Sequence, residues 1–184
     1  MKKILKMIVI IIGAIIALLA GVYAYYGGFS KITFNEIERG GDVLVYENVV
    51  GDYKQAATVS DRVYNILLND YNIETFKGFG IYYDNPANVE KSKMRSEVGC
   101  IMETMPDSIT VSQIETQFNI KELPQGKYLS IEFPFKGSMS ILVGIMRVYP
   151  ALNKYIERNG LDSEGAIMEI YDVPNKKIIY LKAI

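Results

Sequence analysis

The sequence predicts an α+β protein: one apolar helix, followed by a domain built from two β-α-β-β units. Three observations lead to this prediction. A long uncharged run opens the chain, strand-like and helix-like segments fill the remainder, and two short motifs recur in each half. Because the order strand, helix, strand, strand occurs twice, we expect one curved antiparallel sheet, with two helices on one face and a groove on the other.

The first element is a candidate transmembrane helix within residues 1–30. Met7 to Tyr26 is an unbroken run of uncharged, mostly aliphatic residues. At 1.5 Å per residue it spans about 30 Å, the hydrocarbon thickness of a bilayer. A cleaved signal peptide is the alternative, but the run exceeds the usual length of a signal sequence, which favours an uncleaved, single-pass anchor in the lipid bilayer. Lys2, Lys3 and Lys6 precede the run, so the positive-inside rule places the N-terminus in the cytoplasm and the domain outside it.

The second region, residues 31–184, has the length of one ordinary domain. β-branched and aromatic runs predict its strands, and apolar residues at helical spacing predict its helices. In the first unit, about 42–103, we expect strands at 43–49, 79–83 and 93–102 and a helix over 53–71. In the second unit, about 126–183, we expect strands at 127–133, 166–171 and 177–181 and a helix over 138–159, kinked or restarted at Pro150.

Two short identities support an internal repeat. Arg62-Val63-Tyr64 reappears as Arg147-Val148-Tyr149, an offset of 85 residues. Tyr83-Asp84-x-Pro86 reappears as Tyr171-Asp172-x-Pro174, an offset of 88 residues. A few residues inserted between helix and strand reconcile the two offsets. Their coincidence with the repeated element order favours duplication.

Composition excludes several classes of function. The net charge is −1 and charges of both signs are mixed along the chain, so no basic surface for nucleic acid is expected. The chain has no histidine and one cysteine, Cys100. Histidine-based metal sites, cysteine-rich zinc sites and an intramolecular disulfide are therefore excluded, and we predict neither a metal nor a cofactor.

Three segments resemble the GyrI-like (gyrase-inhibitory-like, effector-binding) family. They are Gly80 to Pro86, Met94 to Gly99, and Met168 to Tyr171. The resemblance implies a duplicated β-α-β-β fold with a central groove that binds small, often amphipathic or cationic molecules. It also implies hydrolysis of strained, cyclopropane-bearing compounds in some members. The family's pocket carboxylate falls at the position of Glu169.

The candidate site follows from strand alternation, which places every second side chain on one face. Ile167, Glu169 and Tyr171 then share a face, and Met168 and Ile170 face the helices. Taking the repeat into account, we expect six residues to line the groove: Phe79, Ile81, Tyr83, Ile167, Glu169 and Tyr171. In this hypothesis the Glu169 carboxylate pairs with a ligand cation, and Tyr83 and Tyr171 offer their ring faces.

Three functions remain open from the sequence. The first is a membrane-anchored domain that binds a small amphipathic or cationic ligand. The second is a hydrolase of strained electrophiles that uses Glu169 as its catalytic acid or base. The third is a membrane-tethered scaffold for an unknown protein partner. One carboxylate, with no histidine and no glycine loop for phosphates, favours binding over catalysis.

Overall fold

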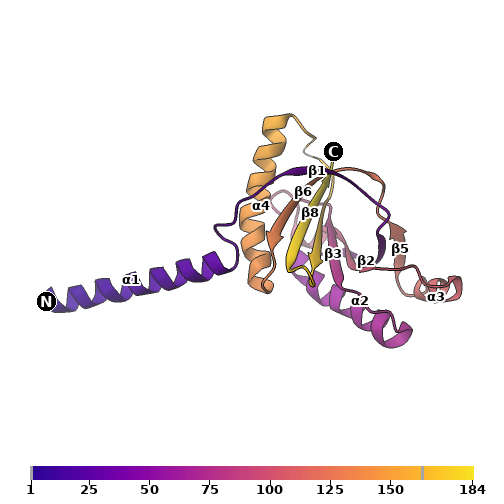
Figure 1. Cartoon of the computed structure of the whole chain (residues 1–184), viewed down its shortest axis with the longest axis horizontal. Helices are drawn as coiled ribbons and strands as arrows, with labels where there is room; N and C mark the ends of the chain where they lie inside the picture. Colours follow the sequence, from indigo (N-terminus) through magenta and orange to yellow (C-terminus); the bar gives the residue numbers. More distant parts are fainter. Residues whose placement is uncertain (1, 163) are drawn as a thin grey trace.

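Eight antiparallel strands form one sheet, and an apolar N-terminal helix extends away from it (Figure 1). The computed structural model describes residues 2–162 and 164–184. The strands are β1 (Asn35–Arg39), β2 (Val43–Val50), β3 (Lys77–Tyr82), β4 (Arg95–Met102), β5 (Asn119–Glu122), β6 (Gly126–Pro134), β7 (Ile167–Asp172) and β8 (Lys177–Ala183). The helices are α1 (Lys2–Tyr25), α2 (Ala56–Tyr71), α3 (Ser108–Ile114) and α4 (Ser138–Asn159), with short 3-10 turns at Tyr53–Gln55 and Lys91–Lys93.

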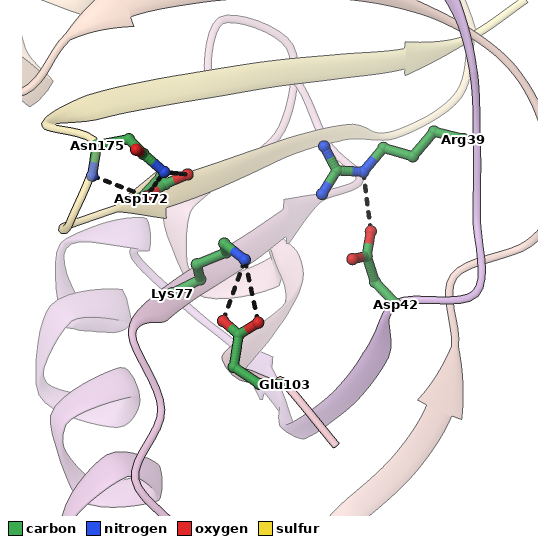
Figure 2. A network of polar contacts seen from close by, with 6 residues as sticks. All are labelled: Arg39, Asp42, Lys77, Glu103, Asp172 and Asn175. Carbon is green, nitrogen blue, oxygen red and sulfur yellow. Dashed lines mark hydrogen bonds and ion pairs between the residues drawn. The ribbon is translucent and has the colours of Figure 1, made fainter. Parts of the chain in front are cut away.

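The sheet curls until its two edges meet at one end. The strand order is β1-β6-β8-β7-β3-β4-β2-β5, yet residues 40–42 alone join β1 to β2, and residues 123–125 alone join β5 to β6. Such short connections between opposite sides of the sheet require the edges to approach each other. The Leu123 N–H donates to the Asp42 carbonyl oxygen at 2.8 Å, which links the two connections. Arg39 Nε also donates to Asp42 Oδ2 at 2.8 Å (Figure 2). The sheet is therefore a half-barrel.

The inner face of the half-barrel is filled by apolar side chains from six strands. They include Leu44, Phe79, Ile101, Ile170 and Leu181, each at most 1% exposed. Each such side chain contributes about 1.5–3 kcal/mol of burial free energy. The inner face is therefore a packed apolar core.

The outer face carries both long helices. From α2, Val59, Val63 and Leu67 pack against β2 and β4, and from α4 residues such as Val148 and Leu152 pack against β6 and β8. Asn72 and Gly160, both with left-handed backbone conformation, end these helices. The predicted α+β class, the curved antiparallel sheet and two helices on one face are confirmed.

The two predicted units have matching connectivity. Each runs strand, helix, strand, strand, as β2-α2-β3-β4 and β6-α4-β7-β8. Within the sheet their local orders, β2-β4-β3 and β6-β8-β7, meet at the β3–β7 pair. This arrangement supports the duplication and the unit boundaries, which stay predictions.

Polar contacts hold the strand ends near this central pair. Asp172, the last residue of β7, accepts hydrogen bonds from the Asn175 backbone N–H at 3.1 Å and from Asn175 Nδ2 at 2.9 Å (Figure 2). Lys77, the first residue of β3, forms an ion pair with Glu103 at 3.0 Å. These contacts fix the β7–β8 turn and the start of β3. Strands β3 and β7 form part of the floor of the site.

Three elements were not predicted from the sequence. β1 and β5 are short edge strands with few apolar residues, so alternation is weak there. α3 begins at Asp107, whose Oδ1 accepts from the Ile109 N–H at 3.0 Å and thereby caps the helix. Of the two alternatives predicted at Pro150, the restart is wrong, because α4 continues through this residue, and the kink stays a prediction. Pro150 is exposed, so the carbonyl of residue 146 that loses its helical partner lies at the surface.

Helix α1 is long and apolar enough to cross a membrane. Its most apolar stretch of 18 residues has a mean hydropathy of 2.8, and none of the 24 residues of the helix is buried against the domain. At 1.5 Å per residue it is about 36 Å long. A signal sequence near an N-terminus shares this length and apolar composition.

Candidate functional site

An open cleft of about 1840 Å³ lies between α2 and α4 above the outer face of the sheet. The walls carry apolar and small polar residues from both helices, among them Ala57, Ser60, Tyr64, Ile141, Ile145 and Tyr149. The floor is formed by β3, β4 and β7. Gly78 lies on this floor opposite Tyr171, and its lack of a side chain lets Ser60 of α2 approach the sheet, since a Cβ there would lie 3.0 Å from the Ser60 hydroxyl oxygen.

Glu169 is the charged group at the centre of the cleft. It lies on β7 and is 2% exposed. The Tyr149 hydroxyl donates to Glu169 Oε1 at 2.6 Å, and the Tyr171 hydroxyl donates to Oε2 at 2.5 Å. The first phenol comes from α4 and the second from β7 itself, so helix and sheet both hold the carboxylate.

Two further phenols surround this carboxylate because glycines make room for them. Tyr82 lies over Gly80, where a Cβ would be 2.5 Å from the Tyr82 hydroxyl oxygen. Gly80 is the cross-strand partner of Glu169, so the Tyr82 phenol reaches toward the carboxylate. Tyr180 occupies space left by Gly144 of α4, and its ring centroid lies 6.0 Å from that of Tyr149.

Burial controls the ionisation of this cluster. Desolvation raises the pKa of Glu169, and the hydrogen bonds from Tyr149 and Tyr171 lower it only in part. Burial, together with the charge of Glu169, raises the pKa of both phenols, so they remain donors. Among the ion pairs of the described residues, none includes Glu169. The carboxylate is thus desolvated and has phenol donors in place of a cation.

The cleft is acidic as a whole. Its lining contains seven carboxylates, Asp52, Asp61, Glu74, Asp84, Glu157, Glu164 and Glu169, and two lysines, Lys54 and Lys77. Asp84 is paired with Arg95 and Asp52 with Lys91. The remaining excess of negative charge favours a cation at the mouth of the cleft. Across the described residues, no group of three or more potential metal ligands gathers.

The structure brings three of the predicted site residues together. Ile167, Glu169 and Tyr171 lie side by side on the outer face of β7 and line the cleft. The predicted face of Phe79 and Ile81 is wrong. Gly80 pairs with Glu169, so its neighbours point to the opposite face, where both side chains pack in the inner core. Phe79 still borders the cleft, but Ile81 does not.

Tyr83 lies at the rim of the cleft, beyond the end of β3. The guanidinium carbon of Arg95 is 6.0 Å from the centroid of its ring. Its neighbour Tyr82 takes the position that the repeat argument assigned to Tyr83. The motif offset of 88 residues aligned Tyr83 with Tyr171, whereas Tyr82 is the residue that shares the face of Glu169. A slip of one residue in a strand moves every side chain to the other face.

The predicted position of the groove is corrected for the same reason. The cleft lies on the helix-bearing face, between the helices, and the opposite face is closed by the inner core. Sequence reasoning also missed Tyr82 and Tyr149. The spacing of Ile141, Ile145 and Tyr149 on one helical face, and the glycines at alternate positions of β3, are the signals that point to them.

A curved sheet with two helices on one face and a cleft between them defines a class of small-molecule-binding domain. The chain belongs to the family described as the GyrI-like small molecule binding domain, whose sequence model matches residues 47–180. This match covers both helices and the cleft-forming strands β3, β4 and β7.

Two curated relatives are similar in sequence. Testis-expressed protein 264 of Homo sapiens is 25% identical over 158 residues, which are 82% of this chain and 50% of that protein. Its Mus musculus homolog is 32% identical over 100 residues, 52% of this chain and 32% of that protein. The chain matches half the length of the human relative and less of the mouse relative.

Solved structures share the fold at low sequence identity. The C-terminal domain of EcmrR has a TM-score of 0.57 at 11% identity, covering 83% of this chain and 96% of that one. SAV2435, solved with tetraphenylphosphonium bound, has a TM-score of 0.51 at 13% identity, covering 81% and 91%. A hydrolase encoded by lin2189 from Listeria innocua has a TM-score of 0.50 at 11% identity, covering 81% and 90%. These likenesses concern the fold alone.

Proposed function

We propose that this protein is a membrane-anchored GyrI-like domain that binds a lipophilic or amphipathic cation between α2 and α4. The observation that carries the proposal is the state of Glu169, a buried carboxylate with two phenol donors and no ion-pair partner among the described residues. A buried charge of this kind is costly until a counter-charge arrives. A ligand cation supplies that charge, and the surrounding tyrosine rings add cation–π attraction.

The cleft suits a cation with an apolar body. Its walls include Ile141, Leu142 and Ile145, and its rim bears the excess of carboxylates described above. SAV2435, which has the same fold, was solved with tetraphenylphosphonium, a cation of this type. Apolar walls with one buried charged group are typical of sites that take such molecules.

The anchor in this proposal is α1, a single span with its basic N-terminus in the cytoplasm and the domain on the far side. Its length matches a bilayer, and its lysines precede the apolar run. Protease added to intact cells is then expected to cleave the domain. Full protection of the domain until the membrane is opened would reverse the orientation without removing the anchor.

Calorimetric titration of the full chain in lipid nanodiscs tests binding, with tetraphenylphosphonium as the probe and empty nanodiscs subtracted. We expect Glu169→Gln to lower affinity by about tenfold or more, since a buried ion pair loses one partner. Glu157→Gln, a matched change at the rim of the same cleft, is expected to change affinity by less than about threefold. Two outcomes would refute the proposal. One is equal affinity of wild type and Glu169→Gln for tetraphenylphosphonium. The other is equal affinity of the wild type for this cation and for a neutral tetraphenyl analogue.

Hydrolysis is the second candidate, and it rests on the same carboxylate. The raised pKa of Glu169 suits a general acid or base, and the phenols of Tyr149 and Tyr171 hold its two carboxylate oxygens in place. Incubation with a strained cyclopropane electrophile, followed by mass spectrometry, separates the two functions. Ring-opened product that forms with wild type and is absent with Glu169→Gln would establish catalysis.

A further inference from the structure

The first half of α4 presents an apolar stripe away from the sheet. Met139, Leu142 and Met146 are 44%, 50% and 61% exposed, and their spacing places them along one side of the helix. The second half of the same side is polar, with exposed residues such as Asn153 and Glu157. The apolar character is thus confined to one end of one helix, and it needs a partner there.

This end of α4 is where α1 enters the domain. The Lys136 ammonium lies 4.4 Å from the centroid of the Tyr25 ring, at the last residue of α1. Arg147 Nη2 donates to the Ser30 carbonyl oxygen at 3.1 Å, which ties the connecting segment to α4. Tyr26 packs on the apolar cluster beneath α4. The apolar stripe therefore lies beside the point at which the chain would leave a membrane.

The two helices are oriented for contact with the same bilayer. In Figure 1, α4 runs across the end of α1 and not alongside it. With α1 along the membrane normal, α4 lies parallel to the membrane surface and next to it. A helix in this position is stable when apolar residues enter the headgroup layer and cations flank them.

The charges around the stripe fit this position. Lys136 lies just before α4 and Arg147 lies within it, and residues 136–150 contain no carboxylate. Lys31 follows Ser30, whose carbonyl accepts from Arg147. Acidic side chains are instead found on the second half of α4 and along the cleft. The basic surroundings of the stripe are complementary to anionic lipid headgroups.

We propose that Met139, Leu142 and Met146 lie in the interface of the bilayer that α1 spans, so that the cleft opens at the headgroup layer. This proposal rests on the membrane anchoring in the proposed function. Leu142 also lines the cleft, so the stripe and the mouth of the site are continuous. A lipophilic cation dissolved in the membrane then reaches Glu169 along α4 without crossing bulk water.

The test uses the absence of tryptophan from this chain. Single tryptophans are introduced in the full-length protein as Met146→Trp, Leu142→Trp, Ile12→Trp and Glu115→Trp, and each variant is reconstituted in vesicles of phosphatidylcholine and phosphatidylglycerol. Ile12 reports on the anchor. Glu115 is exposed and follows α3, at the far side of the molecule from α1 (Figure 1). Circular dichroism confirms that each variant is folded.

Brominated lipids quench tryptophan fluorescence on contact. We expect strong quenching of Ile12→Trp, quenching of Met146→Trp and Leu142→Trp by about twofold, and none of Glu115→Trp. Quenching of Ile12→Trp alone would overturn the inference and leave the anchor intact. No quenching of Ile12→Trp would overturn both the anchor and the inference. The third contrary outcome is that neither brominated lipid nor acrylamide quenches the fluorescence of Met146→Trp, and that this protection depends on protein density in the vesicles. It would assign the stripe to contact with a second copy of the chain and overturn the inference.

Discussion

The two faces of the same sheet differ in what they bury. On the inner face, Phe79 and Ile170 meet other aliphatic and aromatic side chains and exclude water. On the outer face, at the adjacent position of each strand, Gly80 and Glu169 leave space and a buried charge between two helices. Alternate residues of β3 and β7 thus belong to the core and to the candidate site in turn. The comparison teaches that a site can be placed on the most central strands without weakening the core beneath it.

The largest expected effect is on the inner face. Phe79→Ala leaves a cavity in a core where the side chain is 1% exposed, and we expect it to lower the free energy of unfolding by about 3–5 kcal/mol. Urea denaturation followed by circular dichroism measures this loss. Tyr82→Phe, three residues along β3 and on the outer face, is the control, with an expected loss of about 1 kcal/mol. Similar losses for the two variants would contradict the separation of faces.

The second effect has the opposite sign. Glu169→Gln removes a buried charge, keeps one oxygen as acceptor for one phenol, and offers an N–H donor to the hydroxyl oxygen of the other. We therefore expect the unliganded protein to gain on the order of 1 kcal/mol at neutral pH. For a protein of this size that corresponds to a rise in Tm of about 2–4 °C. Differential scanning calorimetry measures it, with Glu157→Gln as the matched control.

The pH dependence of this gain follows from the raised pKa of Glu169. The folded state binds the proton more tightly than the unfolded state, so the wild type is relatively most stable below the unfolded pKa, about 4.3. Its stability falls as pH rises from there through the folded pKa. The difference in Tm between Glu169→Gln and wild type should therefore be smallest in acid and widen toward neutral pH. A difference that narrows with rising pH would show that the pKa of Glu169 is lowered by folding.

A smaller effect is expected at the helix-borne phenol. Tyr149→Phe removes the 2.6 Å hydrogen bond to Glu169 Oε1 and leaves the ring in place. The carboxylate is then harder to ionise, so its pKa is higher than in the wild type. As the pH is lowered, cation binding should therefore be lost at a higher pH than in the wild type. At neutral pH we expect affinity to fall about two- to fivefold. Titrations of tetraphenylphosphonium across pH test this, and an unchanged pH profile would contradict the role of Tyr149.

The smallest effect is expected on the sheet surface. Glu132 pairs with Lys177 at 2.6 Å, but its side chain is 56% exposed. Glu132→Gln should change the free energy of unfolding by about 0.5 kcal/mol or less, because an exposed ion pair gains little over water. Thermal denaturation should show a nearly unchanged Tm. A loss as large as that of Phe79→Ala would mean that the sheet is stabilised by surface charge and not by its inner core.

Much of the fold could be predicted because the local signals are strong. Residues 138–159 are helical as expected, and the six predicted strands are all present with ends shifted by at most a few residues. β1 and β5 were missed since edge strands need less apolar alternation. Within the site, Glu169 and its strand neighbours were found from the family resemblance and alternation. Tyr149 and Tyr82 were not found in this way. Tyr149 lies on a helix 20 residues away in the chain from Glu169, and Tyr82 reaches the carboxylate over Gly80 of the neighbouring strand.

By itself, the sequence determined the elements of this protein, because hydrophobic periodicity and turn residues act over a few neighbouring positions. It also determined the chemistry available at the site, since the chain contains no histidine and Glu169 is the carboxylate within the apolar run of β7. Only the tertiary structure decided which face that carboxylate occupies. The pairing of Gly80 with Glu169 sets this register through hydrogen bonds between strands that lie far apart in the chain. A shift of one residue there would exchange the core for the cleft.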